Sequence, residues 1–180
     1  MHIVCHQCGA TNRVPEDRFG ENPVCGQCKA ALMPAEPLAL DDASLPAYLD
    51  SEQLVTRRDD LLVTSDIDLW AEPFDDGISR VVAANLRNLT GSMNIQPVQR
   101  FTTLDYTHLL ELRVSQFEND SAGRMVLRGA WRLQPVTGAD ASEHAFRIAL
   151  PLTADSTDVK SRVKAMNEAL LRLAREIPMP

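Results

Sequence analysis

The sequence predicts an α/β protein in two parts: a small cysteine-bearing ribbon, then a layered α/β domain with a mixed β-sheet and two main helices. All four cysteines lie in the first 28 residues, as two Cys-x-x-Cys pairs. The rest of the chain contains four blocks that alternate apolar and polar residues like β-strands, and two stretches that repeat apolar residues with a helical period. Strands and helices in this order are typical of layered α/β domains.

Both cysteine pairs have the spacing of zinc-binding knuckles. Cys5 and Cys8 form the first pair, Cys25 and Cys28 form the second, and sixteen residues separate the two pairs. Two residues between thiolates allow one tight turn to aim both sulfurs at the same ion, and two such turns complete a tetrahedral shell. The spacing therefore predicts a zinc ribbon that holds one structural Zn²⁺ with no open coordination position.

The residues around the cysteines leave alternatives open. The four cysteines could instead form two disulfides or act as redox dithiols. His2 and His6 lie nearby, but four thiolates fill the shell, so we expect neither histidine to be a ligand. Gly9 and Gly26 are expected to supply a positive φ or a close approach to sulfur. Because the segment has little apolar material, the metal is expected to supply most of its folding free energy.

Prolines, alanines and acids mark a connector between the two parts. We assign residues 1–40 to the zinc ribbon, residues 41–53 to the connector and residues 54–180 to the α/β domain. The junction is placed no more finely than residues 41–54. Residues 45–54 fit either a short helix or an extended lead-in.

The first part of the α/β domain predicts a strand followed by a helix. Residues 61–70 alternate apolar and polar side chains. Pro73 suits the first turn of a helix, the acids after it complement the positive end of the helix dipole, and Gly91 can close the helix. Asn85 lies on the apolar face of this helix, and we expect its side chain to be satisfied by hydrogen bonds.

The second part predicts a long hairpin, a third strand and a closing helix. Residues 106–115 and 124–133 alternate around a polar turn, and residues 146–150 form the third strand. The helix is expected to begin near Asp155 or Ser156, which are good N-caps. Its apolar stripe is expected to pack on the sheet, although the same spacing could serve as a coiled-coil seam. The stripe consists of Val159, Val163, Met166, Leu170, Leu173 and Ile177.

The charge distribution argues against nucleic acid as a partner. The chain carries 18 Lys and Arg against 25 Asp and Glu, and neither part is basic, so counterion release cannot drive binding to phosphates. The arginine row of the hairpin, Arg124, Arg128 and Arg132, is expected to be a solvated stripe, although it could dock an acidic partner or lipid head groups. We find no glycine-rich phosphate loop and no Ser/His/Asp set in a recognisable context, and we expect no enzymatic activity.

The sequence also indicates the cellular compartment in which the protein is expected to lie. No apolar run approaches the eighteen or so residues needed to cross a bilayer, and the first residues lack the basic flank and apolar core of a signal peptide. Clustered thiolates favour a reducing compartment. As written, the chain is expected to be cytoplasmic.

Residues 1–52 resemble the zinc ribbon that precedes some bacterial thioredoxins. The resemblance rests on both cysteine pairs with Val4 and Gly26, on Asn12-Arg13-Val14-Pro15 and on the connector that begins at Pro37. In that family a thioredoxin domain with a Trp-Cys-Gly-Pro-Cys turn follows the ribbon. This chain has no cysteine after Cys28, so that redox turn is absent.

The remainder, residues 53–180, resembles the paraquat-inducible protein C family, the auxiliary lipoproteins of ABC-type transport systems. Leu45-Pro46-Ala47-Tyr48-Leu49-Asp50 is similar to the lead-in of that family. The matching motifs within the domain are Trp70-Ala71-Glu72-Pro73, Ala84-Asn85-Leu86, Arg113-Val114-x-x-Phe117-Glu118, Val126-Leu127-x-x-Ala130-Trp131, Val163-x-Ala165-Met166-Asn167-x-Ala169-Leu170 and Leu173-Ala174-Arg175-Glu176-Ile177.

The second resemblance implies a non-enzymatic accessory subunit of an intermembrane lipid transport system. Members of that family are anchored by lipid in the outer membrane, face the periplasm and act with mammalian-cell-entry-type proteins. This chain has a zinc ribbon where the family has a signal peptide and a lipidated cysteine. The alternatives are a thioredoxin-related redox protein that uses the Cys-x-x-Cys pairs, and a zinc-ribbon adaptor that binds another protein. The lipid, the oligomeric state and the way in which the two parts were joined are left open.

Overall fold

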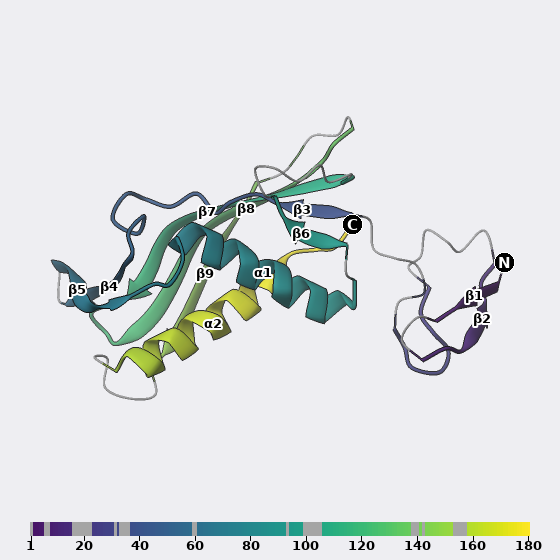
Figure 1. Ribbon diagram of the computed structural model, residues 1–180, viewed down its shortest axis with the longest axis horizontal. Coiled ribbons are helices and arrows are strands. Elements are labelled where there is room, and N and C mark those ends of the chain that lie inside the picture. Colours follow the sequence, from purple (N-terminus) through teal and green to yellow (C-terminus); the bar gives the residue numbers. More distant parts are fainter. Residues whose placement is uncertain are drawn as a thin grey trace.

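The computed structural model describes residues 2–5, 8–15, 23–30, 32, 37–58, 61–92, 94–98, 106–137, 141, 143–152 and 158–180. Its elements, labelled in Figure 1, are β1 (His2–Val4), β2 (Thr11–Arg13), β3 (Leu38–Leu40), β4 (Gln53–Arg58), β5 (Leu61–Leu69), α1 (Phe74–Thr90), β6 (Ile95–Pro97), β7 (His108–Asn119), β8 (Arg124–Pro135), β9 (Glu143–Pro151) and α2 (Val159–Glu176). The predicted α/β class, with a mixed sheet and two main helices, is confirmed.

A five-stranded mixed sheet forms the body of the α/β domain, with the strand order β6-β3-β7-β8-β9. β3 runs parallel to both of its neighbours, whereas β7, β8 and β9 are antiparallel. The long hairpin and the third strand were predicted correctly. β3 and β6 were not predicted, because each has only three residues and β3 is buried throughout, so neither shows a period of two. The domain was predicted to start at residue 54, but β3 lies before that residue and is a strand of the five-stranded sheet.

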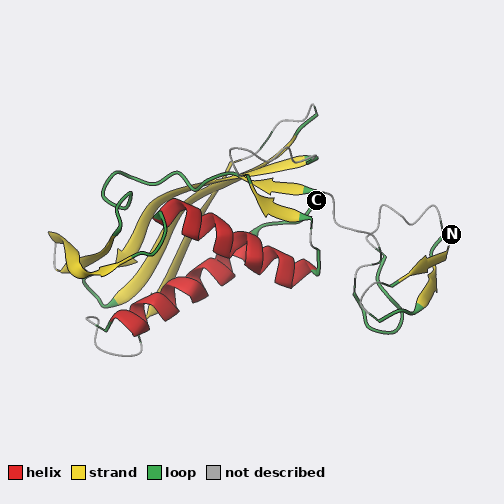
Figure 2. Ribbon diagram, in the orientation of Figure 1, coloured by secondary structure: helices red, strands yellow, loops and turns green. Residues whose placement is uncertain are grey.

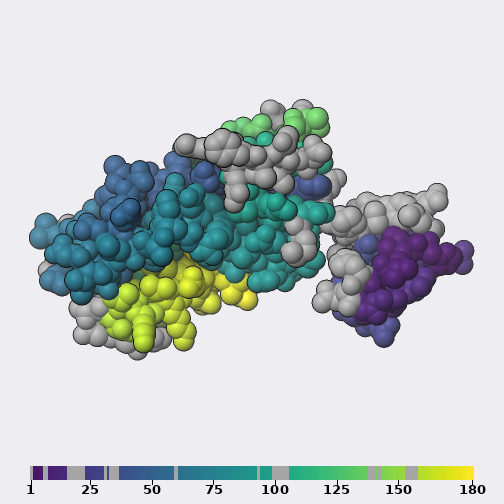
Figure 3. All heavy atoms as spheres, viewed as in Figure 1, coloured from purple at the N-terminus to yellow at the C-terminus, as the bar shows by residue number. Residues whose placement is uncertain are grey.

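Both helices pack on the same face of this sheet (Figure 2). α1 buries Ile78 and Val82, and α2 buries Met166, Leu170 and Leu173 in the same hydrophobic cluster as the sheet. The two helices also contact each other, as the space-filling view in Figure 3 shows. The apolar stripe of the closing helix is therefore core packing and not a coiled-coil seam.

The structure refines the ends and the apolar face of α1. Pro73 occupies the N-cap position before the helix, with φ −50° and ψ 136°, and so it precedes the first turn. Gly91 closes the helix as predicted, in the left-handed region at φ 70°, and its N–H donates to the Arg87 carbonyl. The expectation for Asn85 is wrong: its Nδ2 is buried and has no hydrogen-bond partner among the described residues.

α2 begins at Val159, later than predicted. Asp158 is its N-cap, and the carboxylate accepts a hydrogen bond of 2.9 Å from the Ser161 N–H. The proposed caps Asp155 and Ser156 lie outside the described residues. Several acceptable cap residues follow one another in this stretch, so sequence pattern alone does not choose between them.

The predicted strand at residues 61–70 is present as β5, but it pairs with β4 in a separate two-stranded sheet. Residues 47–50 form a turn, and β4 begins at Gln53, so residues 45–54 do not form a helix. Leu54 and Val55 of β4 are buried in the main cluster. This contact attaches the small sheet to the domain.

A fully buried carboxylate, that of Glu118 in β7, fixes the segment before β5 against the sheet. It accepts hydrogen bonds from the Arg57 guanidinium at 3.0 Å, the Tyr48 hydroxyl at 3.0 Å, the Gln116 amide at 3.2 Å and the Phe117 N–H at 3.0 Å. A buried charge is costly unless it is paired and hydrogen-bonded, and this one is both. Burial, followed by the charge of Glu118, raises the pKa of Tyr48 above its usual range.

The arginine row on the hairpin is partly neutralised. Arg124 forms an ion pair of 2.7 Å with Asp120, and Arg132 lies 3.6 Å from Glu111. Both pairs are exposed and contribute little to stability. Arg128 is exposed between them, as the pattern predicted.

Among the described glycines, Gly129 in β8 has the least room for a side chain. It lies beside the irregular register between Val114 and Gln116, and a Cβ there would be 2.0 Å from the Arg113 carbonyl oxygen and 2.9 Å from Phe146 Cζ. The first of these atoms is backbone, so it cannot turn away.

We therefore expect Gly129→Ala to lower the free energy of unfolding by about 3 kcal/mol or more, measured by urea denaturation. Gly77→Ala is the matched control, because its Cβ would find its nearest atom, Glu72 Oε1, at 3.4 Å. Gly77 is the fourth residue of α1 and has helical backbone, so this change is expected to stabilise by up to about 0.5–1 kcal/mol. Equal effects of the two substitutions would contradict the steric argument.

Candidate metal centre

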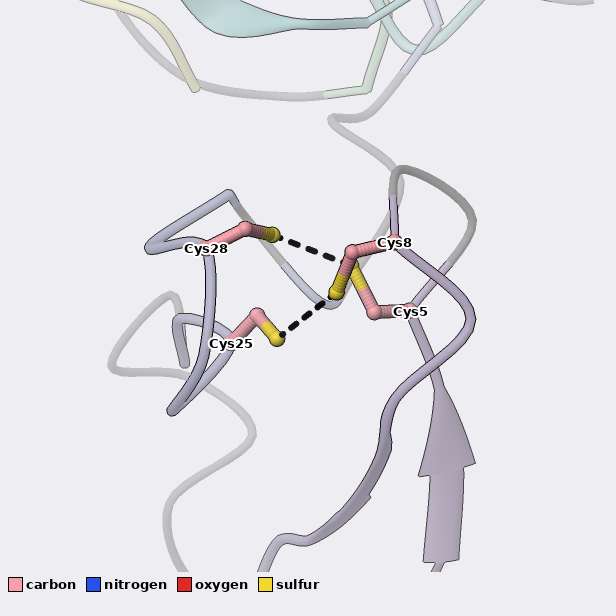
Figure 4. Close-up of side chains that lie close together, drawn as sticks. All are labelled: Cys5, Cys8, Cys25 and Cys28. Carbon is pink, nitrogen blue, oxygen red and sulfur yellow. Dashed lines mark hydrogen bonds between the residues drawn. The ribbon is translucent and has the colours of Figure 1, made fainter.

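The structure brings together the four cysteines that the sequence singled out (Figure 4). Their Sγ atoms all lie within 4.8 Å of one another, with 3.5 Å between Cys5 and Cys28 and 3.6 Å between Cys8 and Cys25. A tetrahedral zinc ion with Zn–S bonds of about 2.3 Å places its sulfurs about 3.8 Å apart. The cluster therefore has the donor type, the number of donors and the spacing that such an ion requires.

The two knuckles repeat one backbone pattern. The Gly9 N–H donates to the Cys5 carbonyl at 2.8 Å, and the Lys29 N–H donates to the Cys25 carbonyl at 3.0 Å. Within the described residues of the knuckles, Gly9 and Lys29 have positive φ, at 73° and 65°. The expectation of positive φ is thus correct for Gly9 and wrong for Gly26, because the turn requires it one residue after the second cysteine of each pair.

Asn12, in β2, links the two knuckles and was not recognised as a site residue from the sequence. Its Nδ2 donates to the Ala10 carbonyl at 2.9 Å and to Cys25 Sγ at 3.4 Å, while its Oδ1 accepts the Gly26 N–H at 2.9 Å. Its position in the resemblance to the thioredoxin ribbon was the one signal available. An amide that donates to a thiolate sulfur orients a metal ligand and tunes its charge.

Burial and charge differ within the cluster. Cys5 and Cys25 are buried, whereas Cys8 and Cys28 are exposed. Hydrogen bonding from the Cys28 N–H is the main cause that lowers the pKa of Cys25 to about 6. The Ala10 N–H lowers the pKa of Cys8, but hydrogen bonds with the neighbouring thiols, above all that of Cys28, and desolvation raise it to about 12. Four clustered sulfurs therefore do not all ionise easily without a cation among them.

The alternative ligands and bonds fit the structure less well. All four cysteines are free, and the shortest Sγ–Sγ distances exceed the bond length of about 2.05 Å of a disulfide. His2 is exposed in β1, and His6 lies outside the described residues. Apart from two of the cysteines, the buried hydrophobic cluster of the ribbon contains Val14 and Leu32. Because this cluster of described residues is small, we expect the metal site to supply most of the stability of the ribbon.

Comparison with known families identifies the larger part of the chain. A family model described as the ABC-type transport auxiliary lipoprotein component matches residues 26–178, which include all elements from β3 to α2. The chain belongs to this family. Among the described residues of this family member, no helix is both long enough and apolar enough to cross a membrane.

The N-terminal part has a different relationship. A family model for the N-terminal zinc ribbon of thioredoxin 2 matches residues 4–30. Thioredoxin C-3 from Corynebacterium nephridii is 42% identical over 72 residues, which are 40% of this chain and 43% of that protein. The chain thus spans less than half the length of this relative. Both resemblances stated from the sequence are confirmed.

Solved structures share the fold of the ABC-type auxiliary domain. A crystal structure described as that of an uncharacterized protein has a TM-score of 0.67 at 20% identity, covering 81% of this chain and 92% of its own. The structure of protein XCC0632 from Xanthomonas campestris, of family DUF330, has a TM-score of 0.64 at 19% identity, covering 78% and 80%. At these identities the likeness establishes the fold.

The Asn12 side chain supports the cysteine ligands but supplies no sulfur itself. It can therefore be removed while all four sulfurs remain. We expect Asn12→Ala to lower the affinity for Zn²⁺ by about tenfold, because Cys25 loses a hydrogen bond and the Gly26 N–H loses its acceptor. Competition against a chromophoric chelator measures this affinity. Asn88→Ala, an exposed position on α1, is the control and is expected to change nothing. An unchanged affinity in the Asn12 variant would show that the amide does not support the ligands.

Proposed function

We propose that this protein is a non-enzymatic accessory component of an ABC-type system that moves lipids between membranes, and that it carries a structural zinc ribbon. The observation that supports this most strongly is the family match across residues 26–178, which covers the complete sheet and both helices. We further propose that the accessory domain begins by residue 38, since β3 is the second strand of its sheet.

In this proposal Cys5, Cys8, Cys25 and Cys28 hold one Zn²⁺ through their thiolates. The ion would supply a fixed positive charge that keeps the four sulfurs ionised and together, and no coordination position would be open for chemistry. The fit of the Sγ spacing to a tetrahedral S4 shell supports this assignment.

An exposed apolar strand supports a role in binding protein. β5 exposes Leu61 by 70%, Ile67 by 87% and Leu69 by 60% of their surfaces. Among the described strands β5 pairs with β4 alone, so its other edge is open for hydrogen bonding to an added strand. Exposed apolar side chains along an open edge suit a protein partner, which we propose to be a mammalian-cell-entry-type component of the same system.

The redox alternative requires an accessible thiolate of low pKa. Cys25 has the lowered pKa but is buried, and Cys8 is exposed but has a raised pKa. The fit of the four Sγ atoms to one tetrahedral ion and the burial of Cys5 and Cys25 support a structural role for the cysteines over a redox role. The other alternative is a zinc-ribbon adaptor, in which another protein binds to the ribbon and not to β5.

The test is a binding measurement between the full zinc-loaded chain and the purified mammalian-cell-entry-type component, by biolayer interferometry. We expect a specific complex, and we expect Ile67→Asp to weaken it at least tenfold by placing a charge on the β5 surface. Val136→Asp is the matched control, since Val136 is also an exposed apolar residue, at 57%, but lies outside β5.

Three outcomes would contradict the proposal. Absence of binding to any transport component would remove the accessory role. Binding that survives Ile67→Asp but is lost on chelation of zinc would transfer the interaction to the ribbon and favour the adaptor. Rapid alkylation of the cysteines in the zinc-loaded chain, without chelator, would favour the redox reading.

A further inference from the structure

An apolar cavity of about 230 Å³ lies between α1 and α2. Phe117 of β7, Ile78 of α1 and Leu170 of α2 line it, and each of these side chains is otherwise buried. The cavity therefore reaches into the hydrophobic core and is more than a crease between two helices. The cavity is open at its rim, so an apolar ligand could enter it and remove its apolar lining from water.

Aromatic rings form one wall of the cavity. Trp70 and Phe74 stack with ring centroids 4.7 Å apart, and Phe74 stacks on Phe117 at 5.7 Å. The three rings lead from the segment before α1 down to the sheet. Because each ring is held by its neighbour, the wall is pre-formed, as is usual in small-molecule sites.

The volume of the cavity limits the width of a ligand that can enter it. An α-helix with its side chains is about 10–12 Å across and cannot enter, and drug-sized ligands usually occupy about 300–1,000 Å³. Three successive rings make a wall longer than one aromatic ligand, which favours an extended alkyl chain over a compact ring.

The charges at the rim of the cavity indicate which head group a bound ligand would carry. Glu72 and Arg80 lie at the rim, where they form an ion pair, and the adjoining depression is lined by these two residues together with Asp75 and Asp76. Hydrogen bonding from Arg80 lowers the pKa of Glu72, so this carboxylate is ionised at neutral pH. Asp42 also lines this depression, and four carboxylates against one guanidinium repel an anionic head group and attract a cationic one.

We propose that this cavity binds the single alkyl chain of a small amphiphile whose ammonium-type head group lies at the rim beside Glu72, Asp75 and Asp76. The chain would extend along the rings of Trp70 and Phe74 towards Phe117. This binding site goes beyond the proposed accessory function and does not depend on it, because a protein partner can bind β5 whether or not the cavity is filled.

The test is isothermal titration of decylammonium into the full zinc-loaded chain, below the concentration at which the amphiphile forms micelles. We expect saturable binding at one site, accompanied by a change in Trp70 fluorescence. Val163→Phe is expected to weaken binding at least tenfold, because Val163 lines the cavity and the larger ring would occupy it. Leu89→Phe is the control: it enlarges an apolar residue of α1 outside the cavity and is expected to leave binding unchanged.

Circular dichroism, read at the helical bands, checks that the variants fold. If Val163→Phe does not fold, Val81→Phe replaces it, since Val81 lines the cavity from the opposite helix. The head-group assignment is tested with decanoate, which we expect to bind about fivefold more weakly at low salt, with a smaller difference at high salt. Failure of decylammonium to saturate, or equal binding to the filled variants, would overturn the site. Tighter binding of decanoate would overturn the ammonium head group.

Discussion

Burial of one face of a five-stranded sheet under two helices is the interaction on which the ABC-type auxiliary domain depends. The buried side chains of α1, α2 and the sheet form one continuous cluster, to which β4 also contributes. At about 25 cal/mol per Å² of apolar surface, burial on this scale is the dominant favourable contribution to folding. The remaining features of the domain, including the paired Glu118 carboxylate and the cavity beside Phe117, are arranged around that layer.

The ribbon is stabilised by different physics. Among the described residues, its hydrophobic cluster is separate from that of the domain: it buries two cysteines, Val14 and Leu32, with Ile3, Ala10 and Ala30 packed against them. Four sulfurs from two knuckles, with Asn12 joining them, replace a core with a coordination site. We therefore expect one chain to combine a unit that apolar burial can fold and a unit that requires an ion.

The sequence was most informative where a pattern extended over many residues. The cysteine spacing, the β7–β8 hairpin and both amphipathic helices could be predicted, because each repeats a signal several times. β3 and β6 could not, since three residues are too few to show alternation and their pairing depends on distant strands. The role of Asn12 follows from the arrangement of two knuckles in space, which neither knuckle shows alone. The positive φ of Lys29 is local to its turn, but a residue with a Cβ rarely adopts it, so the residue type did not indicate it.

The central claim is that metal holds the ribbon and apolar burial holds the domain, each independently of the other. Hydrogen–deuterium exchange of the full chain, with and without a zinc chelator, tests this most directly. The account predicts that chelation removes protection from the amides of residues 4–30 and leaves those of α1, α2 and β7–β9 unchanged. Loss of protection throughout the chain, or no loss within residues 4–30, would contradict it.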